Sequence, residues 1–310
     1  MLVYSLPMTT RFRGITVREG VLLRGDAGWG EFCPFPEYDD AESRPWLDAA
    51  REAADTGWPE PVRSHVPVNA IVPAVAPERA HAMVRASGCT TAKVKVADAP
   101  GSLADDLARV EAVRDALGPA GHVRVDANAR WDVDGAVHAI RELDRAAGGL
   151  QYVEQPCPSI DELAAVRRRV DVRIAADESV RRAADPLRVA LAGAADVVVL
   201  KCAPLGGVRR ALAVAQACGL PCVVSSALES AVGMAAEIAL AGALPDLDFA
   251  CGLGTGALLA ADVAPSPRPV DGLLPVPRTA PDPAVPPALS ADPTRTAWWH
   301  ARLARVTALP

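Results

Sequence analysis

The chain has 310 residues, of which 50% are hydrophobic and 23% are charged, and its formal net charge is −6. This length suffices for one large α/β domain and a smaller one, and the composition is that of a globular protein. The acidic balance and the aromatic content of 4% argue against nucleic-acid partners, polybasic membrane binding and a base-stacking surface.

The first 62 residues predict an α+β unit of their own. Three strands are expected, at residues 2–6, 15–24 and 28–35. Asp39 or Asp40 can cap a helix that runs to about Ala54, because an aspartate side chain accepts hydrogen bonds from the free amides at a helix N-terminus. The proline-rich residues 57–63 then indicate a linker.

Strands and helices alternate regularly from residue 65 onward. Eight strands are expected, at 66–72, 91–96, 122–128, 150–155, 172–177, 197–202, 221–226 and 249–253. The helices predicted between them include 77–86, 103–117, 134–147, 160–170, 207–218 and 229–241. This alternation favours a closed parallel (β/α) barrel of the TIM type. A doubly wound open sheet is the alternative, but no Gly-x-Gly-x-x-Gly follows an early strand.

Residues 264–310 form a proline-rich C-terminal segment, which cannot pair continuously in a sheet. We expect it to return over the surface and to end in a helix over residues 294–306. Trp298 and Trp299 in this helix are expected to pack against the rest of the protein rather than to form a binding site.

Seven cysteines occur, at positions 33, 89, 157, 202, 218, 222 and 251, without a CxxC pair. Several lie in apolar strand-like runs, so we expect reduced core residues of a cytoplasmic protein. No apolar run reaches the length of a transmembrane helix, and residues 1–30 do not have the layout of a signal peptide. We therefore expect no membrane partner.

The second strand of the alternating region reads Thr-Ala-Lys-Val-Lys-Val over residues 91–96. Residues i and i+2 of a strand share a face, so Lys93 and Lys95 point to the same side. Two ammonium groups on a buried face repel each other and lose hydration, which lowers the pKa of at least one of them. Such a lysine can accept a proton at neutral pH. An edge strand with one solvent-exposed face is the alternative.

Acidic residues stand near the ends of the next three strands, at Asp126, Glu154 and Asp177. Lys201 ends the sixth strand, and the seventh ends in Ser225 and a second serine. From Asp126 to Ser225, each of these residues lies about one strand–helix unit after the one before it in the sequence. We therefore expect them to form a ring at the C-terminal mouth of the barrel, where barrel enzymes work.

The three carboxylates predict a metal site. Carboxylates that converge in a partly dry pocket repel one another and require a cation or protonation. Oxygen ligands without histidine or cysteine favour Mg²⁺, for which Mn²⁺ can substitute. For any one acid, helix capping or loop anchoring is the alternative, but three acids on consecutive strands flanked by lysines favour the metal site.

This set of residues resembles the muconate-lactonizing subgroup of the enolase superfamily. The matching segments are Lys93-Val-Lys95, Asp126-Ala-Asn128, Glu154-Gln-Pro156, Asp177-Glu178-Ser179 and Lys201. The resemblance covers nearly the whole chain and implies an enolase-like α/β fold. Residues 1–62 would form an α+β capping domain and 63–263 the barrel, while 264–310 would return toward the capping domain.

The resemblance also implies a shared first step, in which a base removes the proton α to a substrate carboxylate and a metal stabilises the resulting enediolate. By position, Lys95 is the implied base and Lys93 its pKa-lowering neighbour. Lys201 would face the substrate from the opposite side. In epimerases of the subgroup this lysine is a second acid or base, whereas in dehydrating members it stabilises the intermediate by a cation–π contact.

Within the subgroup, residues 223–230 and 250–256 resemble the o-succinylbenzoate synthase family of menaquinone biosynthesis, which eliminates water from a succinyl-substituted cyclohexadiene carboxylate. Dipeptide epimerases carry Asp-x-Asp on strand eight to hold an ammonium group, but here Gly252 and Gly254 occupy that place. Ser225 and backbone amides near Gly252 and Gly254 are expected to bind a succinyl carboxylate. Tight turning at the barrel mouth is the alternative role of the glycines.

Two other functions stay open. N-succinylamino acid racemization, or another epimerase or cycloisomerase reaction, uses the same parts. A barrel that binds a metal or ligand without catalysis is the alternative from another class, which the loss of one lysine or acid would have suggested. Arg18 and Glu19 are expected in a loop near the mouth, as a solvated hairpin tip rather than as residues that close over the substrate.

Overall fold

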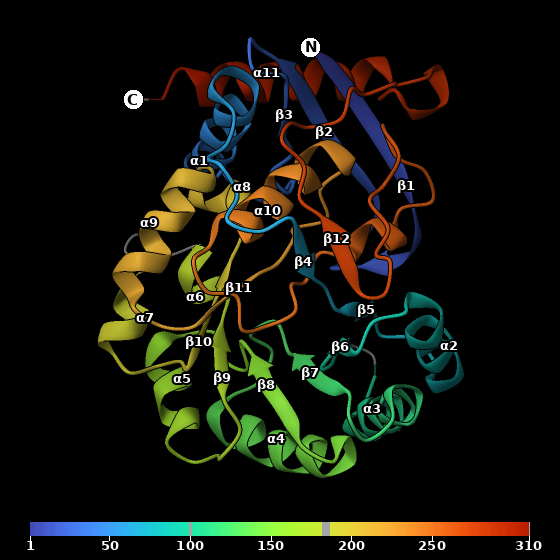
Figure 1. The fold of residues 1–310 in the computed structure, drawn as a ribbon, viewed down its shortest axis with the longest axis vertical. Coiled ribbons are helices and arrows are strands. Elements are labelled where there is room, and N and C mark those ends of the chain that lie inside the picture. Colours follow the sequence, from blue (N-terminus) through green and yellow to red (C-terminus); the bar gives the residue numbers. More distant parts are fainter. Residues whose placement is uncertain (99–100, 182–186, 310) are drawn as a thin grey trace.

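The structure is a computed structural model that describes residues 1–98, 101–181 and 187–309. In these ranges the strands form a three-stranded sheet, a seven-stranded sheet and a two-stranded pair (Figure 1). The enolase-like arrangement predicted from the sequence is confirmed: a small α+β unit packs on a (β/α) barrel. The boundaries 62/63 and 263/264 stay predictions.

The small unit is built on an antiparallel sheet whose strands, in order, are β1 (Leu2–Phe12), β2 (Ile15–Arg24) and β3 (Trp29–Phe32). Helix α1 (Asp40–Arg51) packs against β3 and is capped by Asp39, whose side chain accepts from the Glu42 backbone amide at 2.8 Å. The helix continues as a π-helical turn, η1 (Glu52–Thr56), which ends at Gly57. The predicted helix therefore changes its hydrogen-bonding pattern in its last turn.

The C-terminal segment returns to this unit, as predicted. Helix α11 (Pro293–Thr307) lies beside α1 and the three-stranded sheet (Figure 1). Trp299 is fully buried, with its ring edge-on to Phe32 at 6.1 Å between centroids, and Trp298 packs edge-on to Trp299. The packing role predicted for both tryptophans is confirmed.

The barrel sheet is entirely parallel and follows chain order. Its strands are β5 (Ala70–Val72), β6 (Thr91–Lys95), β7 (His122–Asp126), β8 (Leu150–Glu154), β9 (Ile174–Ala176), β10 (Val197–Leu200) and β11 (Cys222–Val224). The helices that connect and cover them are α2 (Pro77–Ser87), α3 (Leu103–Leu117), α4 (Val133–Ala147), α5 (Ile160–Arg167), α6 (Glu178–Arg181), α7 (Arg188–Leu191), α8 (Cys202–Leu205), α9 (Val208–Cys218) and α10 (Ala231–Ala243).

Two parallel bridges close the ring in place of a full eighth strand. Cys251 bridges to Val68, just before β5, and Gly252 bridges to Ser225, just after β11. The predicted strand 249–253 is shortened to these bridges, and the chain then enters a 3₁₀ turn, η2 (Thr255–Leu258). Because the sheet closes, the open doubly wound alternative is wrong.

The first predicted barrel strand, 66–72, is split in two. Its beginning, β4 (His65–Pro67), leaves the ring and pairs antiparallel with β12 (Leu273–Pro275) of the proline-rich segment. Its later part joins the barrel, through the bridge of Val68 and through β5. Before α11, the proline-rich segment thus contributes one short strand and a 3₁₀ turn, η3 (Pro287–Leu289), to the described structure.

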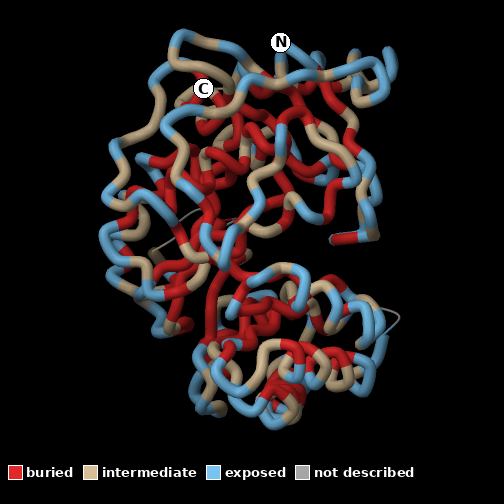
Figure 2. The backbone as a smooth tube through the Cα atoms, turned by 45° about the vertical axis from the view of Figure 1, so that its right-hand side comes forward, coloured by how far each residue is buried: buried red, intermediate tan, exposed pale blue. Residues whose placement is uncertain are grey.

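Side-chain alternation gives the barrel an outer and an inner core. Figure 2 shows buried residues along the inner segments of the chain and exposed residues along its outer segments. On β6, Ala92 and Val94 face the surrounding helices. Tyr152, Val199 and Val223 fill the interior below the mouth, since each precedes a mouth residue by two positions. This packed interior fixes the strand ends that carry the polar residues.

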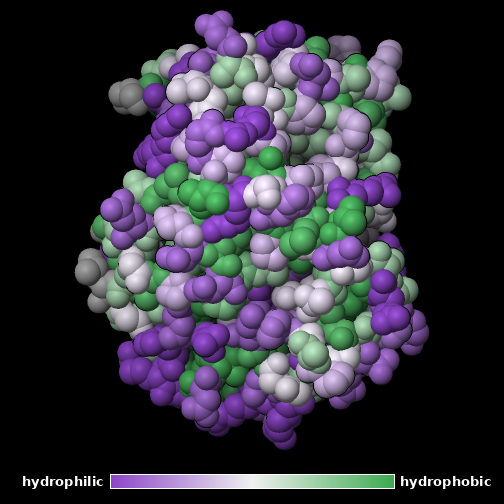
Figure 3. Space-filling view, viewed as in Figure 1, coloured by the Kyte–Doolittle hydropathy of each residue, from purple (hydrophilic) through white to green (hydrophobic). Residues whose placement is uncertain are grey.

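All seven cysteines are buried thiols, as predicted. On the face seen in Figure 3, hydrophilic side chains are spread over the whole molecule, with small hydrophobic patches between them. Within the described residues, no helix combines the length and apolar character that a membrane crossing needs.

Candidate active site

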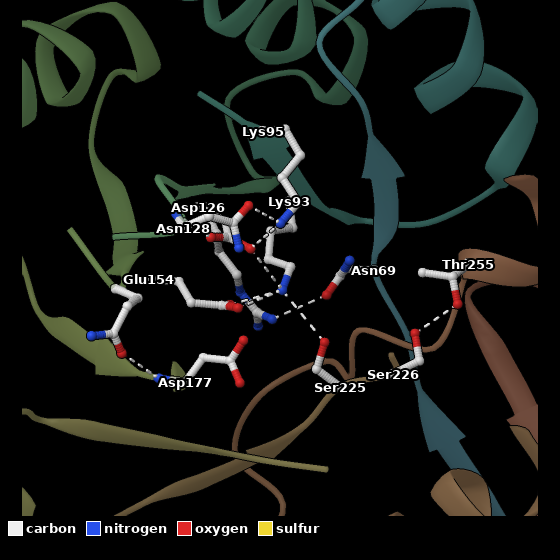
Figure 4. Close-up of polar contacts among 12 residues, drawn as sticks. Asn69, Lys93, Lys95, Asp126, Asn128, Glu154, Asp177, Ser225, Ser226 and Thr255 are labelled. Atoms are coloured by element: carbon white, nitrogen blue, oxygen red, sulfur yellow. Dashed lines mark hydrogen bonds and ion pairs between the residues drawn. The ribbon is translucent and has the colours of Figure 1, made fainter. Parts of the chain in front are cut away.

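Lys93 and Lys95 point from β6 into the barrel mouth (Figure 4). Burial lowers the pKa of Lys95, and the Lys93 ammonium acts in the same direction, although Asp126 opposes both. Burial also acts to lower the pKa of Lys93, but Glu154 and Asp126 outweigh it and raise this pKa. The predicted lowering of at least one lysine pKa is therefore confirmed, and it falls on Lys95.

The parallel register brings the predicted acids together. Lys95 on β6 pairs with Asp126 at the end of β7, and Asp126 pairs with Glu154 at the end of β8. Asp177 follows β9 directly, and Ala175 of that strand pairs with Glu154. The positions expected to meet at the carboxyl ends of the strands do meet there (Figure 4).

Each acid is held by a lysine of the same mouth. The three pairs, with nitrogen–oxygen distances of 2.5, 2.8 and 2.6 Å, are Lys95–Asp126, Lys93–Glu154 and Lys201–Asp177. Burial disfavours an ionised Asp126, but Lys95 and Lys93 outweigh it and hold the pKa of this acid below its usual range. Arg181 and Lys201 likewise outweigh burial and lower the pKa of Asp177.

Glu154, in the middle of the row, shows the mutual repulsion that the sequence predicted. Burial, reinforced by the charge of Asp126, raises the pKa of Glu154 to about 7 even though Lys93 opposes the shift. At Glu154, the positive charge of Lys93 therefore does not fully compensate for burial and for the repulsion by Asp126.

The chemistry of this donor set fits a hard divalent cation, because it offers three carboxylates and neither histidine nor cysteine. As the side chains stand, no three acidic, histidine or cysteine side chains in the described ranges are arranged to hold an ion. Their contacts give the reason, since each carboxylate turns toward a lysine. The positions of the three acids on their strands therefore fit a metal site, whereas their carboxylate oxygens are paired with lysine ammonium groups in this structure.

The chain contains three lysines, and all three line this cavity. Lys201 follows β10, which is separated from β6 by β7, β8 and β9 on one side of the closed ring and by β5, the bridging segment 251–252 and β11 on the other. It therefore faces Lys93 and Lys95 from the opposite side. The other long basic side chains are arginines, which stay charged at any working pH. Lysine occurs at these three positions and nowhere else in the sequence, which points to chemistry that needs a transferable proton.

The capping unit closes the cavity with Phe12 and Arg13, from the turn between β1 and β2. The volume of this cavity is about 30 Å³. The Lys95 ammonium lies 5.1 Å from the centroid of the Phe12 ring. Sequence reasoning missed both residues, although the dipeptide of Arg13 and Gly14 was an available turn signal.

The expectation for Arg18 was wrong. Because β1 extends to Phe12, the hairpin tip lies at residues 13–14, and Arg18 falls in mid-strand. It is 1% exposed and donates to the carbonyl oxygens of Leu228 and Ala227 at 3.0 and 3.2 Å, in the loop after β11. Glu19 accepts from Arg295 of α11 at 2.9 Å. Both residues hold the capping unit in place.

The residues predicted to bind a substrate carboxylate are placed differently from one another. Ser225 lines the cavity, and its Oγ lies 3.4 Å from Lys93 Nζ. The Gly252 amide donates to the Val224 carbonyl at 2.8 Å within the barrel, and a substrate-binding role of backbone amides near Gly252 stays a prediction. Among the described lining residues of the cavity, neither Gly252 nor Gly254 appears, and the role of the Gly254 amide stays a prediction.

Arg181 and Thr255 at the mouth were missed, whereas Asn128 and Ser226 were expected there without a role of their own. Arg181 donates to Asp177 Oδ1 at 2.9 Å, and Asn128 accepts from Lys95 at 2.6 Å. Ser226 and Thr255 share a hydrogen bond of 2.6 Å at the cavity wall. The four-residue spacing from Asp177 to Arg181 was a usable signal, because residues i and i+4 of a helix are neighbours.

Two family models match the chain. The model described as enolase C-terminal domain-like covers residues 76–281, and the one described as enolase N-terminal domain-like covers residues 3–54. Together they take in the barrel mouth and the capping sheet.

Curated relatives match over nearly the full length. A protein of Thermobifida fusca named o-succinylbenzoate synthase is 62% identical over 98% of this chain and 95% of its own length. Proteins with the same name from Mycolicibacterium smegmatis and Mycobacterium tuberculosis are 54% and 55% identical, over 99% and 97% of this chain and 95% and 91% of their own lengths.

Solved structures share the fold at lower identity. Muconate lactonizing enzyme from Pseudomonas fluorescens, complexed with muconolactone, aligns with a TM-score of 0.75 at 23% identity, over 96% of this chain and 97% of that one. The L-Ala-D/L-Glu epimerase from Bacillus subtilis aligns with a TM-score of 0.73 at 23% identity, over 90% and 95%.

Proposed function

Since the chain belongs to the enolase superfamily and, within it, to the o-succinylbenzoate synthase family, we propose that it is a lyase that eliminates water from a succinyl-substituted hydroxycyclohexadiene carboxylate. The observation that carries this proposal is the near-full-length identity of 62% to a protein of that name. The three lysines at one mouth agree with it, because the reaction begins and ends with a proton transfer.

Lys95 is the proposed base. It is the lysine whose pKa is lowered, and Asp126 and Asn128 hold its Nζ at 2.5 and 2.6 Å. Once it has taken the α-proton, Lys95 is an ammonium on the face from which the proton came. It then returns a proton to the departing hydroxyl group, so one residue serves both transfers of a syn elimination.

Asp126, Glu154 and Asp177 would hold the metal ion, for which Mg²⁺ is proposed and Mn²⁺ is expected to substitute. When bound, the ion supplies positive charge beside the negative charge that develops on the substrate carboxylate. Lys93 lies between Glu154 and Ser225, where it is positioned to contact that carboxylate and to keep the pKa of Lys95 low.

Ser225 and the Gly254 amide are proposed to bind the succinyl carboxylate. Phe12 and Arg13 would cover the substrate from the capping side, since they already line the cavity. Because the cavity volume is only about 30 Å³, we propose that the turn at residues 13–14 moves when the substrate enters.

The Ser225 proposal predicts the effect of Gly252→Ala. A Cβ at this position would lie 2.5 Å from Ser225 Oγ, which must turn away and lose its contact with Lys93. We expect KM to rise about 10–100-fold with a smaller change in kcat, because a hydrogen bond to a charged group contributes roughly 1.5–3 kcal/mol. Steady-state kinetics measure this change in KM. Gly256→Ala is the control variant, because its new Cβ would lie at an ordinary contact distance of 3.4 Å from Ser266 Cβ. An unchanged KM would exclude the Ser225 role.

Lys201 is proposed to stay charged throughout and to stabilise the planar intermediate from the opposite face. Lys201→Arg keeps the charge but cannot shuttle protons. We therefore expect this variant to retain measurable o-succinylbenzoate formation, at a reduced rate because the guanidinium has a different shape.

The same variant should lose any racemase side activity, because a racemase needs proton transfer from both faces. Proton exchange of N-succinyl amino acids in deuterium oxide measures that activity, with the wild type as the reference. If Lys201→Arg loses dehydration but retains racemization, Lys201 transfers a proton during dehydration. That result would reject the proposal that Lys95 performs both proton transfers.

We propose that the enzyme serves menaquinone biosynthesis in the cytoplasm. The seven buried thiols support a reducing compartment, where disulfides are rare. Complementation of a menaquinone-deficient strain that lacks its own o-succinylbenzoate synthase tests the pathway directly.

A further inference from the structure

Arg181 uses all three nitrogens of its guanidinium at once. Its Nε donates to Asp177 Oδ1 at 2.9 Å, and its two terminal nitrogens donate to Tyr38 Oη at 2.5 Å and to Glu178 Oε1 at 2.6 Å. The side chain is 7% exposed and lines the catalytic cavity. We call these three hydrogen bonds the Arg181 bridge.

The bridge divides the two oxygens of Asp177 between two tasks. Oδ1 is held by Arg181, which leaves Oδ2 directed at the mouth, where Lys201 binds it at 2.6 Å. The two oxygens of Asp126 are divided in the same way. Its Oδ1 accepts from the backbone amide of Asn128 at 3.0 Å, and its Oδ2 faces Lys95. In both acids one oxygen is fixed by the protein and the other faces the cavity.

Tyr38 connects the bridge to the capping unit. Its ring packs edge-on to Phe35 and Trp46, at 5.6 and 6.2 Å between centroids. Its carbonyl accepts from Arg302 of α11 at 2.6 Å. The hydroxyl that receives Arg181 is therefore fixed by the capping unit, whereas Arg181 and Asp177 belong to the barrel.

The bridge also reaches the proposed base. Glu178 Oε1 accepts from Arg181 and from Asn128 Nδ2, at 2.6 and 3.3 Å. Asn128 in turn accepts from Lys95 at 2.6 Å. One arginine thus connects an acid proposed to bind the metal with the side chain that holds the base.

We propose that Arg181 is a positioning residue that orients Asp177 for the metal ion, and that Tyr38 makes this orientation depend on the seating of the capping unit. This inference rests on the proposed metal site. Arginine suits the task, because its planar fork fixes directions that a lysine ammonium cannot. Partners of metal ligands typically change metal affinity or activity by about 10–100-fold when they are removed.

A role through charge alone gives the opposite result. Arg181 places a positive charge against Asp177, so its removal should strengthen the binding of a cation if charge were all that mattered. If orientation dominates, its removal weakens binding, because the carboxylate then rotates. The sign of the change in metal affinity therefore separates the two roles.

The experiment titrates Mn²⁺ into metal-free protein, without substrate, by calorimetry. We expect Arg181→Met to weaken Mn²⁺ binding about 10–100-fold and Tyr38→Phe to weaken it about tenfold. Arg181→Lys should recover only part of the affinity. In the double variant, Tyr38→Phe should add little to the effect of Arg181→Met, since both remove the same bridge.

Two variants match these changes elsewhere. Tyr4→Phe removes another buried capping hydroxyl, which donates to Glu31 at 2.5 Å. Arg114→Met removes a barrel arginine that donates to the carbonyls of Ala147, Gly118 and Gly121. Both should bind Mn²⁺ like the wild type, and circular dichroism with thermal melts checks that every variant is folded.

Each result has a distinct meaning. Wild-type protein that binds no Mn²⁺ overturns the proposed metal site. Wild-type binding with unchanged or tighter binding by folded Arg181→Met overturns the orientation role. Additive losses in the double variant would show that Tyr38 acts independently and would reject its link through Arg181.

Discussion

Lys95→Ala is expected to reduce kcat for dehydration by about 10²–10⁴-fold, the usual cost of losing a general base. The loss should lie at or beyond the upper end of that range, because the same side chain is proposed to return the proton to the leaving hydroxyl. Asp126 loses its closest cation, yet Lys93 remains 3.7 Å from its Oδ2, so the fold and metal binding should survive. Single-turnover kinetics with saturating Mg²⁺ measure the effect.

The small number of lysines allows a direct control. Selective isotopic labelling of lysine should give three side-chain signals, all from the mouth of the barrel. The signal that disappears in Lys95→Ala should titrate at a lower pH in the wild type than that of Lys93, as the opposite directions of their pKa shifts require. Near-normal turnover by Lys95→Ala would remove this residue from the role of base.

Glu154→Gln is expected to abolish metal binding and to reduce kcat/KM by about 10²-fold or more. Glu154 lies between Asp126 and Asp177, so its loss removes one of three charged ligands while the shape of the side chain is kept. The variant also leaves Lys93 without its main partner, and breaking a buried ion pair costs about 3–5 kcal/mol of stability.

Thermal melts must therefore accompany this measurement, so that binding is measured on folded protein. Asp161→Asn, on the exposed surface at the start of α5, is a matched loss of one carboxylate and should leave Mn²⁺ affinity unchanged. If folded Glu154→Gln binds Mn²⁺ as tightly as the wild type, the ion is held elsewhere. If chelation leaves wild-type turnover intact, the metal requirement fails altogether.

The barrel and the row of acids were predictable because both depend on simple periodicities. Alternation along 91–96 decides which way Lys93 and Lys95 face, and the parallel register then aligns Lys95, Asp126 and Glu154. Residues one strand–helix unit apart must meet at one end of a parallel barrel.

The rest depends on packing between segments far apart in the chain. The length of β1 decides that the hairpin tip is at residues 13–14 and that Arg18 is buried, and nothing local to Arg18 indicates this. The contact of Arg181 with Tyr38 spans 143 residues and two structural units. The partner of the Gly252 amide follows from closure of the ring at β11, which no local pattern specifies.

The most direct test supplies the purified protein with the cyclohexadiene substrate and Mg²⁺ and follows o-succinylbenzoate by mass spectrometry. N-succinyl amino acids are supplied in a parallel reaction, and each reaction is repeated with a chelator. We predict rapid dehydration that stops on chelation and resumes with Mg²⁺ or Mn²⁺. Efficient racemization with negligible dehydration, or dehydration that is indifferent to chelation, would contradict the proposed function.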